Sequence, residues 1–262
     1  MSRGNLKSRL ANKELTIGSW LSFGSPFLAE MMARAGFDWL AVDMEHGLAS
    51  MSEQAQLIQT IDLAGADPLV RVGANDPLLI KQAMDCGARG VIVPMICSPA
   101  EAIQARDALH YPPVGKRGVG LSRAQDYGMG FDRYRRWADE NAVLIVMIEH
   151  IDAVQRIDDI VNVDYVDGFI VGPYDMSGSI GKPGEFDDPQ VQELLDHVTD
   201  VIQRHRKPGG YHVVHSDHEL MHRRIREGCR FMAYGTEMVF LAEKLGLEGE
   251  FTQALKREFG RD

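Results

Sequence analysis

Short apolar runs of strand length alternate with helix-length amphipathic segments along most of the chain. The apolar runs lie at residues 15–21, 39–43, 68–72, 90–94, 143–148, 168–171, 209–213 and 231–234. Helical periodicity marks residues 26–35, 51–64, 76–86, 98–109, 190–206 and 217–227. Eight strands that alternate with helices, without a linker or a break in composition, predict a (β/α)8 TIM barrel, an α/β fold.

The remaining segments frame this pattern. Residues 5–12 predict a short leading helix, residues 110–137 a long irregular loop, and residues 236–259 a pair of amphipathic terminal helices. We therefore expect residues 1–262 to form a single barrel domain, with residues 236–262 as a C-terminal helical extension. A doubly wound sheet is the alternative, but the first strand is not followed by GxGxxG and the chain has no P-loop.

Residues 143–177 hold two acidic side chains at the ends of neighbouring strands. Glu149 follows VLIVMI, and Asp175 lies in the GPYD turn after GFIV. Parallel strands joined by a right-handed crossover end side by side, so both carboxylates are expected at one edge of the sheet. Two carboxylates suit a hard divalent cation better than zinc. The alternative is that both are helix N-caps or surface acids.

Other polar residues are expected at the same ends of the strands, where barrel active sites lie. These are Trp20, Asp43, Glu45, His46 and Arg71. One arginine among carboxylates indicates a metal-assisted reaction on a small anion. The alternatives are an Asp43–Arg71 structural ion pair, a solvated His46, and Trp20 as part of the pocket wall.

Composition narrows the class of protein. The formal net charge of −10 argues against a nucleic-acid or anionic-membrane surface, so we expect a small-molecule partner. The three cysteines show no CxxC motif, and the chain has no apolar run of signal or transmembrane length. These features predict a cytoplasmic protein.

Four histidines in YHVVHSDHELMH suggest a second metal site. His218 and His222 are four residues apart on a predicted helix, a spacing that can share a zinc ion, and His212 and His215 precede them. No glutamate stands between them at the HExxH position, and no thiolate is near. We therefore expect exposed histidines here and no zinc site.

The motifs themselves resemble those of the HpcH/HpaI aldolase family of metal-dependent pyruvate aldolases. The likeness runs from about Leu15 to Leu245 and is carried by GSWL, AGFDWLAVDMEHG, PLVRVGANDP, IKQAMDCGARGVIVPM, YPPVGKRGVG, MIEHIDAV and VDGFIVGPYDMSGSIG. Several motifs in the same order are specific for the family, although not for one substrate.

The resemblance implies a class II aldolase, a carbon–carbon lyase. Such an enzyme reversibly cleaves a 4-hydroxy-2-oxo acid, of the 2-keto-3-deoxy sugar acid or hydroxy-oxo-diacid type, into pyruvate and an aldehyde through a metal-stabilised enolate. It also implies a homohexamer, a trimer of dimers, in which the terminal helices dock on a neighbouring subunit.

The resemblance further implies a role for each site residue. Glu149 and Asp175 match the ligands of Mg²⁺, Mn²⁺ or Co²⁺, and Arg71 matches the arginine that stabilises the enolate. His46 matches a histidine used in proton transfer, and Asp85 the acid paired with it across the subunit or the site. The substrate-binding positions are Trp20, Asp43, Gly172, Pro173, Tyr174 and Asp175, with the N–H groups of Tyr174 and Asp175 holding the substrate carboxylate.

Three residues near the expected site depart from the family pattern. Met147 stands where a glutamine is usual, His150 where a small hydroxyl residue is usual, and Tyr174 where alanine is common. These departures predict an altered aldehyde pocket. The competing functions are an oxaloacetate decarboxylase or acyl-CoA carbon–carbon lyase of the same superfamily, and a non-catalytic protein that binds 2-oxo acids.

Overall fold

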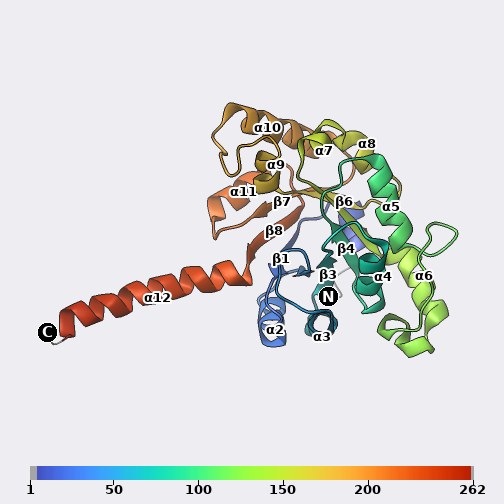
Figure 1. The fold of residues 1–262 in the computed structure, drawn as a ribbon, viewed down its shortest axis with the longest axis horizontal. Coiled ribbons are helices and arrows are strands. Elements are labelled where there is room, and N and C mark those ends of the chain that lie inside the picture. Colours follow the sequence, from blue (N-terminus) through green and yellow to red (C-terminus); the bar gives the residue numbers. More distant parts are fainter. Residues whose placement is uncertain (1–4, 261–262) are drawn as a thin grey trace.

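The computed structural model describes residues 5–260, and within this range eight parallel strands close into a barrel. Each strand pairs with its neighbours in chain order, and β8 returns to pair with β1 (Figure 1). The strands are β1 (Thr16–Leu21), β2 (Trp39–Asp43), β3 (Asp67–Arg71), β4 (Gly90–Val93), β5 (Val143–Ile148), β6 (Gly168–Val171), β7 (Gly209–Val213) and β8 (Phe231–Thr236). The predicted (β/α)8 TIM barrel is confirmed.

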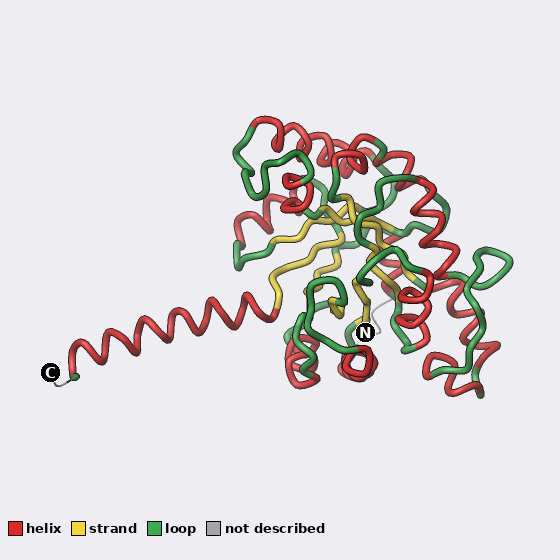
Figure 2. The backbone as a smooth tube through the Cα atoms, in the orientation of Figure 1, coloured by secondary structure: helices red, strands yellow, loops and turns green. Residues whose placement is uncertain are grey.

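Helices surround the strands on the outside, as the tube drawing shows (Figure 2). In chain order they are α1 (Leu6–Ala11), α2 (Pro26–Arg34), α3 (Met51–Ala64), α4 (Pro77–Asp85), α5 (Pro99–Leu109), the 3₁₀ helix η1 (Arg123–Gly128), α6 (Phe131–Asn141), α7 (Ile151–Gln155), α8 (Ile157–Asn162), α9 (Pro173–Gly178), α10 (Pro189–Arg204), α11 (His218–Arg226) and α12 (Glu237–Phe259).

Local sequence signals set the helix boundaries. The Ser50 side chain and Glu53 form a capping box at the start of α3, and Gly65 ends that helix in the left-handed conformation. Asp76 and Ser98 cap α4 and α5, each followed by a proline in the first turn, where a missing N–H costs nothing.

Large apolar side chains fill the part of the barrel interior near the amino ends of the strands. Trp39 of β2 is fully buried and stacks on Phe231 of β8, with ring centroids 4.4 Å apart. Gly18 of β1 lies against the Trp39 indole, because a Cβ atom at Gly18 would be 2.0 Å from the ring. Trp39 therefore joins β1, β2 and β8 at the point where the barrel closes.

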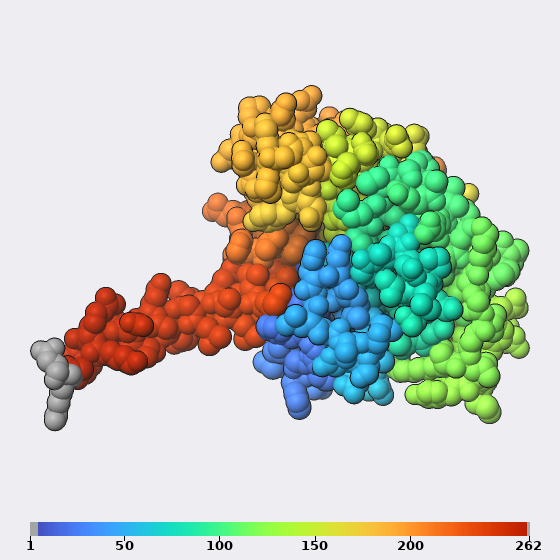
Figure 3. Space-filling model, viewed as in Figure 1, coloured from blue at the N-terminus to red at the C-terminus, as the bar shows by residue number. Residues whose placement is uncertain are grey.

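Helix α12 does not pack along the barrel. Its first turn is anchored by Phe240, which contacts the rings of Phe37 and Tyr234, and the rest of the helix projects away from the body (Figures 1 and 3). Twenty-three residues correspond to about 34 Å of helix. The predicted pair of terminal helices is wrong, since residues 237–259 form one continuous helix that runs through Gly246 and Gly249.

The stretch expected to be irregular also contains regular structure. Residues 123–128 form η1 and residues 131–141 form α6, whose Tyr134 and Ala138 are buried in a small cluster with Tyr111. The prediction missed α6 because RYRRWADEN has too few apolar residues to show a helical period. None of the helices between residues 5 and 260 is both long and apolar enough to cross a lipid bilayer.

The position of Trp39 gives a stability prediction. Trp39→Ala removes a fully buried indole and opens a cavity beside Phe231, so we expect a loss of about 3–5 kcal/mol in the free energy of unfolding. Urea denaturation followed by circular dichroism measures it. Leu63→Ala, at a side chain that is 78% exposed, is the control and should change stability by less than about 0.5 kcal/mol.

Candidate active site

Charged side chains gather where the inward positions of the strands reach the carboxyl end of the barrel. Asp43 is the last residue of β2, Arg71 is the last residue of β3, and Glu149 follows the last residue of β5. Asp43 and Arg71 are also direct partners in the β2–β3 register. Directly below them the same strands carry the apolar inward residues Ala41, Leu69 and Met147, so the change from apolar to charged side chains defines the site.

Arg71 and Asp43 form a buried ion pair with two hydrogen bonds. Arg71 Nε donates to Asp43 Oδ1 at 2.8 Å, and Nη2 donates to Oδ2 at 2.6 Å. Burial alone would raise the pKa of Asp43, but the hydrogen bonds and charge of Arg71 outweigh it and lower that pKa. Asp43 therefore stays ionised and fixes the guanidinium, which keeps further N–H groups for another anion.

Trp20 forms one wall of this site. The Arg71 guanidinium lies over its indole, 4.6 Å from the ring centroid, and the side chain is only 1% exposed. Two of the three alternatives considered from sequence therefore describe real features, since Asp43 and Arg71 are an ion pair and Trp20 is part of the pocket wall. Neither feature excludes the predicted contacts with substrate, which stay predictions.

The loop after β2 adds Glu45 and His46. Asp43 Oδ1 accepts the N–H groups of both residues, at 3.0 and 3.2 Å, which forms the turn. Glu45 Oε2 lies 3.4 Å from Arg71 Nη1 and 3.9 Å from Nε2 of His46, whose side chain is 67% exposed. His46 is thus at the rim, and Glu45, which the sequence places at this end of the barrel without a role, lies between it and the arginine.

Glu149 is a buried carboxylate that accepts few hydrogen bonds and lies near other negative charges. It is 3% exposed, and its Oε1 accepts the N–H of Met95 at 2.6 Å. Within residues 5–260, no group donates a hydrogen bond to Oε2. Burial raises the pKa of Glu149 to about 7, and the negative charges of Glu45 and Asp175 act in the same direction.

Gly172 provides the space that this carboxylate occupies. A Cβ atom at Gly172 would lie 2.7 Å from Glu149 Oε2, so any larger residue would displace the side chain. Pro173, Tyr174 and Asp175 then form the first turn of α9. Asp175 is exposed, close enough for its charge to act on Glu45 and Glu149.

The alternative role of these acids as helix caps does not hold. The N-cap of α7 is His150, whose Nδ1 accepts the N–H of Asp152 at 3.1 Å, and the N-cap of α9 is Gly172. Glu149 and Asp175 therefore have no capping function.

The donor set fits a hard divalent cation. Glu149 offers an oxygen without a hydrogen-bond donor, Asp175 is accessible, and the surrounding charge is negative apart from Arg71. Among the described residues, no group of three or more histidine, cysteine, aspartate or glutamate side chains has metal-binding geometry. The predicted ligand set has two carboxylates, so water and substrate oxygens would complete it.

Comparison with known proteins places this geometry in a family. The model of the HpcH/HpaI aldolase/citrate lyase family matches residues 16–243. A hydroxypyruvate/pyruvate aldolase of Pseudomonas aeruginosa is 36% identical over 94% of this chain and 91% of its own length. A 2-keto-3-deoxy-L-rhamnonate aldolase of Salmonella typhi is 32% identical, over 91% and 89%.

A solved structure agrees with these relatives. The HpcH/HpaI aldolase/citrate lyase family protein from Burkholderia cenocepacia superposes with a TM-score of 0.88 at 31% identity, covering 95% of this chain and 98% of that one. The chain belongs to the HpcH/HpaI aldolase/citrate lyase family. The predicted family and the predicted class of enzyme, a carbon–carbon lyase, are confirmed.

The three departures from the family pattern have different structural consequences. Met147 is 4% exposed and packs with the barrel interior, so it supplies no hydrogen bond to Glu149. His150 caps α7, as described above. Tyr174 is 46% exposed and packs edge-on against Phe186, where it lines a cavity beside the mouth of the barrel.

Asp85 lies away from His46 within one chain. It ends α4, and Arg117 donates to it at 2.5 Å from a guanidinium that lies over the ring of Tyr111. The C-terminal end of α4 faces the amino ends of the strands, opposite the rim where His46 lies. The expected pairing of Asp85 with His46 therefore stays a prediction that requires a second subunit.

The four histidines have different surroundings, and the expectation that all of them are exposed is wrong for His212. His215 lies 3.4 Å from Glu243 at the start of α12, and His218 contacts the ring of Tyr234. His212 instead points into the barrel, where its ring contacts Trp20. The strand alternation would have revealed it, because residues 210 and 212 share the inward face of β7.

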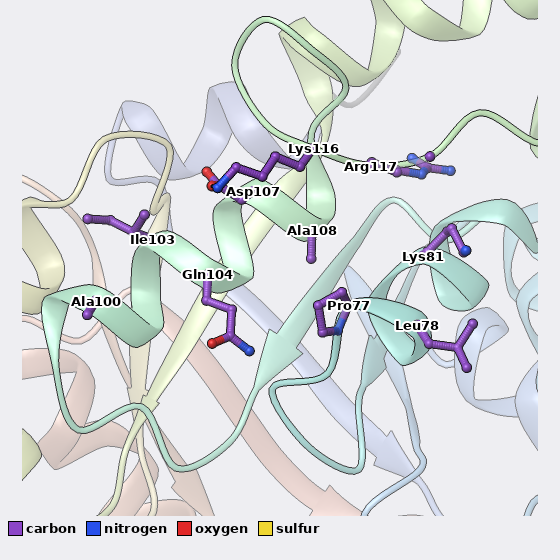
Figure 4. A pocket seen from close by; sticks show the side chains of 11 residues that line it. Pro77, Leu78, Lys81, Ala100, Ile103, Gln104, Asp107, Ala108, Lys116 and Arg117 are labelled. Atoms are coloured by element: carbon purple, nitrogen blue, oxygen red, sulfur yellow. The ribbon is translucent and has the colours of Figure 1, made fainter.

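A cavity of about 540 Å³ lies outside the barrel, between α4 and α5 (Figure 4). Pro77, Leu78 and Lys81 line one side, and Gln104 and Asp107 the other. Lys116 at its edge is paired with Asp107 at 2.8 Å. None of the predicted site residues lines this cavity.

The raised pKa of Glu149 predicts an unusual dependence of stability on pH. Unfolded Glu149 ionises near its ordinary value of 4.5 and folded Glu149 near 7, so the free energy of unfolding falls as the pH rises between these values. In the metal-free protein we expect Glu149→Gln to be more stable than the wild type at pH 8, by about 3 kcal/mol, and equally stable at pH 4.5.

Urea denaturation in the presence of EDTA measures this difference. Glu193→Gln, on the exposed face of α10, is the matched control and should follow the wild type at both pH values. A Glu149→Gln variant that is less stable than the wild type at pH 8 would contradict the interpretation.

Proposed function

We propose that the protein is a divalent-cation-dependent aldolase that reversibly cleaves a 4-hydroxy-2-oxo acid into pyruvate and an aldehyde. The observation that carries this proposal is the buried, poorly compensated Glu149 carboxylate beside a fixed Arg71 at the mouth of a family barrel. The named relatives act on related compounds, a keto-deoxy sugar acid and hydroxypyruvate or pyruvate.

Glu149 and Asp175 would hold the cation, with Mg²⁺, Mn²⁺ and Co²⁺ as the candidates suited to oxygen ligands. When bound, such a cation acts as a Lewis acid on the keto group of the substrate. Gly172 supports this assignment, since it leaves room for the Glu149 carboxylate at the ligand position.

Arg71 would stabilise the enolate. Its Nε and Nη2 donate to Asp43, so the guanidinium is held in place. Nη1 lies 3.4 Å from Glu45 without a hydrogen bond to it, so its N–H groups would turn to an oxygen anion. A preorganised donor of this kind needs no rearrangement as charge develops. The backbone N–H groups of Tyr174 and Asp175 donate to no acceptor within residues 5–260, which fits the expected contact with the substrate carboxylate.

Proton transfer would fall to His46 at the rim. A base removes the proton from the C4 hydroxyl, the bond between C3 and C4 breaks, and its electron pair becomes the enolate of pyruvate while C4 becomes the aldehyde. A proton then returns to C3 to form the methyl group. His46 is exposed and close to Glu45, so the imidazole can reach a bound substrate and exchange protons with solvent.

We further assign α12 to contacts between subunits. Leucine and phenylalanine side chains at residues 245, 247, 251 and 259 are between 59% and 72% exposed, on a helix that projects from the barrel (Figure 3). A helix with such a surface is stabilised when a second chain covers it. A homohexamer, a trimer of dimers, would also bring Asp85 of one subunit towards the His46 of another.

The enolate step has a direct test that needs no aldehyde. The protein should exchange the methyl protons of pyruvate for deuterium, followed by proton NMR, with Mg²⁺, Mn²⁺ or Co²⁺ and not after chelation. Arg71→Ala should slow the exchange by a factor of about 10²–10³ because the enolate loses its donor. Arg34→Ala, at an exposed ion pair on α2, is the matched control. Exchange that is independent of metal would overturn the proposal.

The subunit contact predicts a second result. Light scattering after gel filtration should give a mass several times the 29.2 kDa of one chain. Leu245→Asp places a charge among the exposed apolar residues of α12 and should lower that mass. Gln253→Asp adds the same charge to the same helix at a polar position and should leave it unchanged. A wild-type protein of 29.2 kDa would refute the assignment.

A further inference from the structure

His212 is a histidine of the barrel interior that the proposed chemistry does not use. Strand β7 points Tyr211 outward, where the Arg224 guanidinium lies 4.3 Å from its ring, and His212 inward. The imidazole contacts Trp20 edge-on, with 5.6 Å between the ring centroids. The Arg71 guanidinium lies over the same Trp20 ring, 4.6 Å from its centroid. His212 thus belongs to the same ring of inward side chains as the arginine.

The tautomer of His212 follows from its hydrogen bond. Nε2 lies 3.3 Å from the backbone carbonyl oxygen of Gly235 in β8. A carbonyl only accepts hydrogen bonds, so Nε2 carries the proton and Nδ1 presents a lone pair. Burial lowers the pKa of His212 to about 4, and the positive charge of Arg71 acts in the same direction. The ring is therefore neutral at neutral pH.

The Nδ1 lone pair has no partner in the chain between residues 5 and 260. The side chain is partly exposed, and its ring lies on the inward face of β7 beside Trp20, which also contacts the Arg71 guanidinium. His212 is therefore in the same layer of the barrel interior as the arginine of the proposed site. A substrate held at Arg71 would have its aldehyde half within reach of this side chain.

We propose that His212 Nδ1 accepts a hydrogen bond from a hydroxyl group on the aldehyde half of the substrate, which makes the enzyme selective for hydroxyaldehydes. This role rests on the proposed aldolase function. A neutral acceptor favours a hydroxyl donor and disfavours a carboxylate, whose oxygens would face the lone pair. An aldehyde without a hydroxyl group leaves the lone pair unpaired and loses affinity.

Two aldehydes of equal chain length test the proposal. Glycolaldehyde and acetaldehyde differ by a hydroxyl group, and each is condensed with pyruvate in the presence of Mn²⁺. His212→Leu should lower the ratio of kcat/KM for glycolaldehyde to that for acetaldehyde by a factor of roughly 10–100, because one hydrogen bond is lost. His212→Asn, whose amide can donate to Gly235 and still present an oxygen, should restore part of the ratio.

The control variant is His222→Leu. His222 is exposed on α11, away from the barrel interior, and its replacement should leave the ratio unchanged. Deuterium exchange into pyruvate, which involves no aldehyde, shows whether each variant is folded. His212→Met replaces the leucine variant if that protein does not fold.

The outcomes separate the two proposals. A ratio that stays at the wild-type value in the apolar variant, or equal losses for both aldehydes, would overturn the role of His212 while the aldolase function stands. Absence of metal-dependent exchange in the wild type would overturn the aldolase function, and the assignment of His212 with it.

Discussion

Closure of the parallel sheet is the constraint on which the rest of the structure depends. Once β8 pairs with β1, every second residue of each strand must enter a shared interior that has no access to solvent except at its ends. Near the amino ends of the strands, Trp39, Phe231 and smaller apolar side chains fill this interior. At the carboxyl end the same alternation delivers Asp43, Arg71, Glu149 and His212 to one place. The site is a consequence of the packing geometry.

At the carboxyl end of the barrel, the negative charges outnumber the single positive charge of Arg71. The proposed chemistry depends on this excess of negative charge. Arg71 is shared between Asp43, which takes its two hydrogen bonds, and Glu45, which lies beside it. Glu149 is left with one backbone donor in a buried position. Desolvation raises the pKa of both carboxyl groups, but at Asp43 the hydrogen bonds and charge of Arg71 outweigh it, so the pKa of Asp43 is lowered and that of Glu149 is raised. A cation with free coordination positions is the natural complement to the second.

The exposed surface of α12 and the position of Asp85 are the two features on which the proposed contact between subunits rests. The helix leaves large apolar side chains uncovered, and Asp85 is held by Arg117 far from the rim. A single barrel nevertheless contains the groups proposed for cation binding and enolate stabilisation. The steps that would depend on a second chain are those that involve the rim, where His46 is exposed.

The sequence by itself determined the barrel and which polar residues lie at the carboxyl ends of its strands. Strand-length runs, caps such as Ser50 and Asp76, and polar residues directly after strands are local signals, so the fold, Arg71, Glu149 and Asp175 could be named in advance. Tertiary structure alone decided which groups are partners. The Asp43–Arg71 hydrogen bonds, the approach of Glu45, the single donor to Glu149 and the inward turn of His212 join residues from different strands. Their pKa values depend on burial and on charges that are close only after the barrel has closed, which no local pattern records.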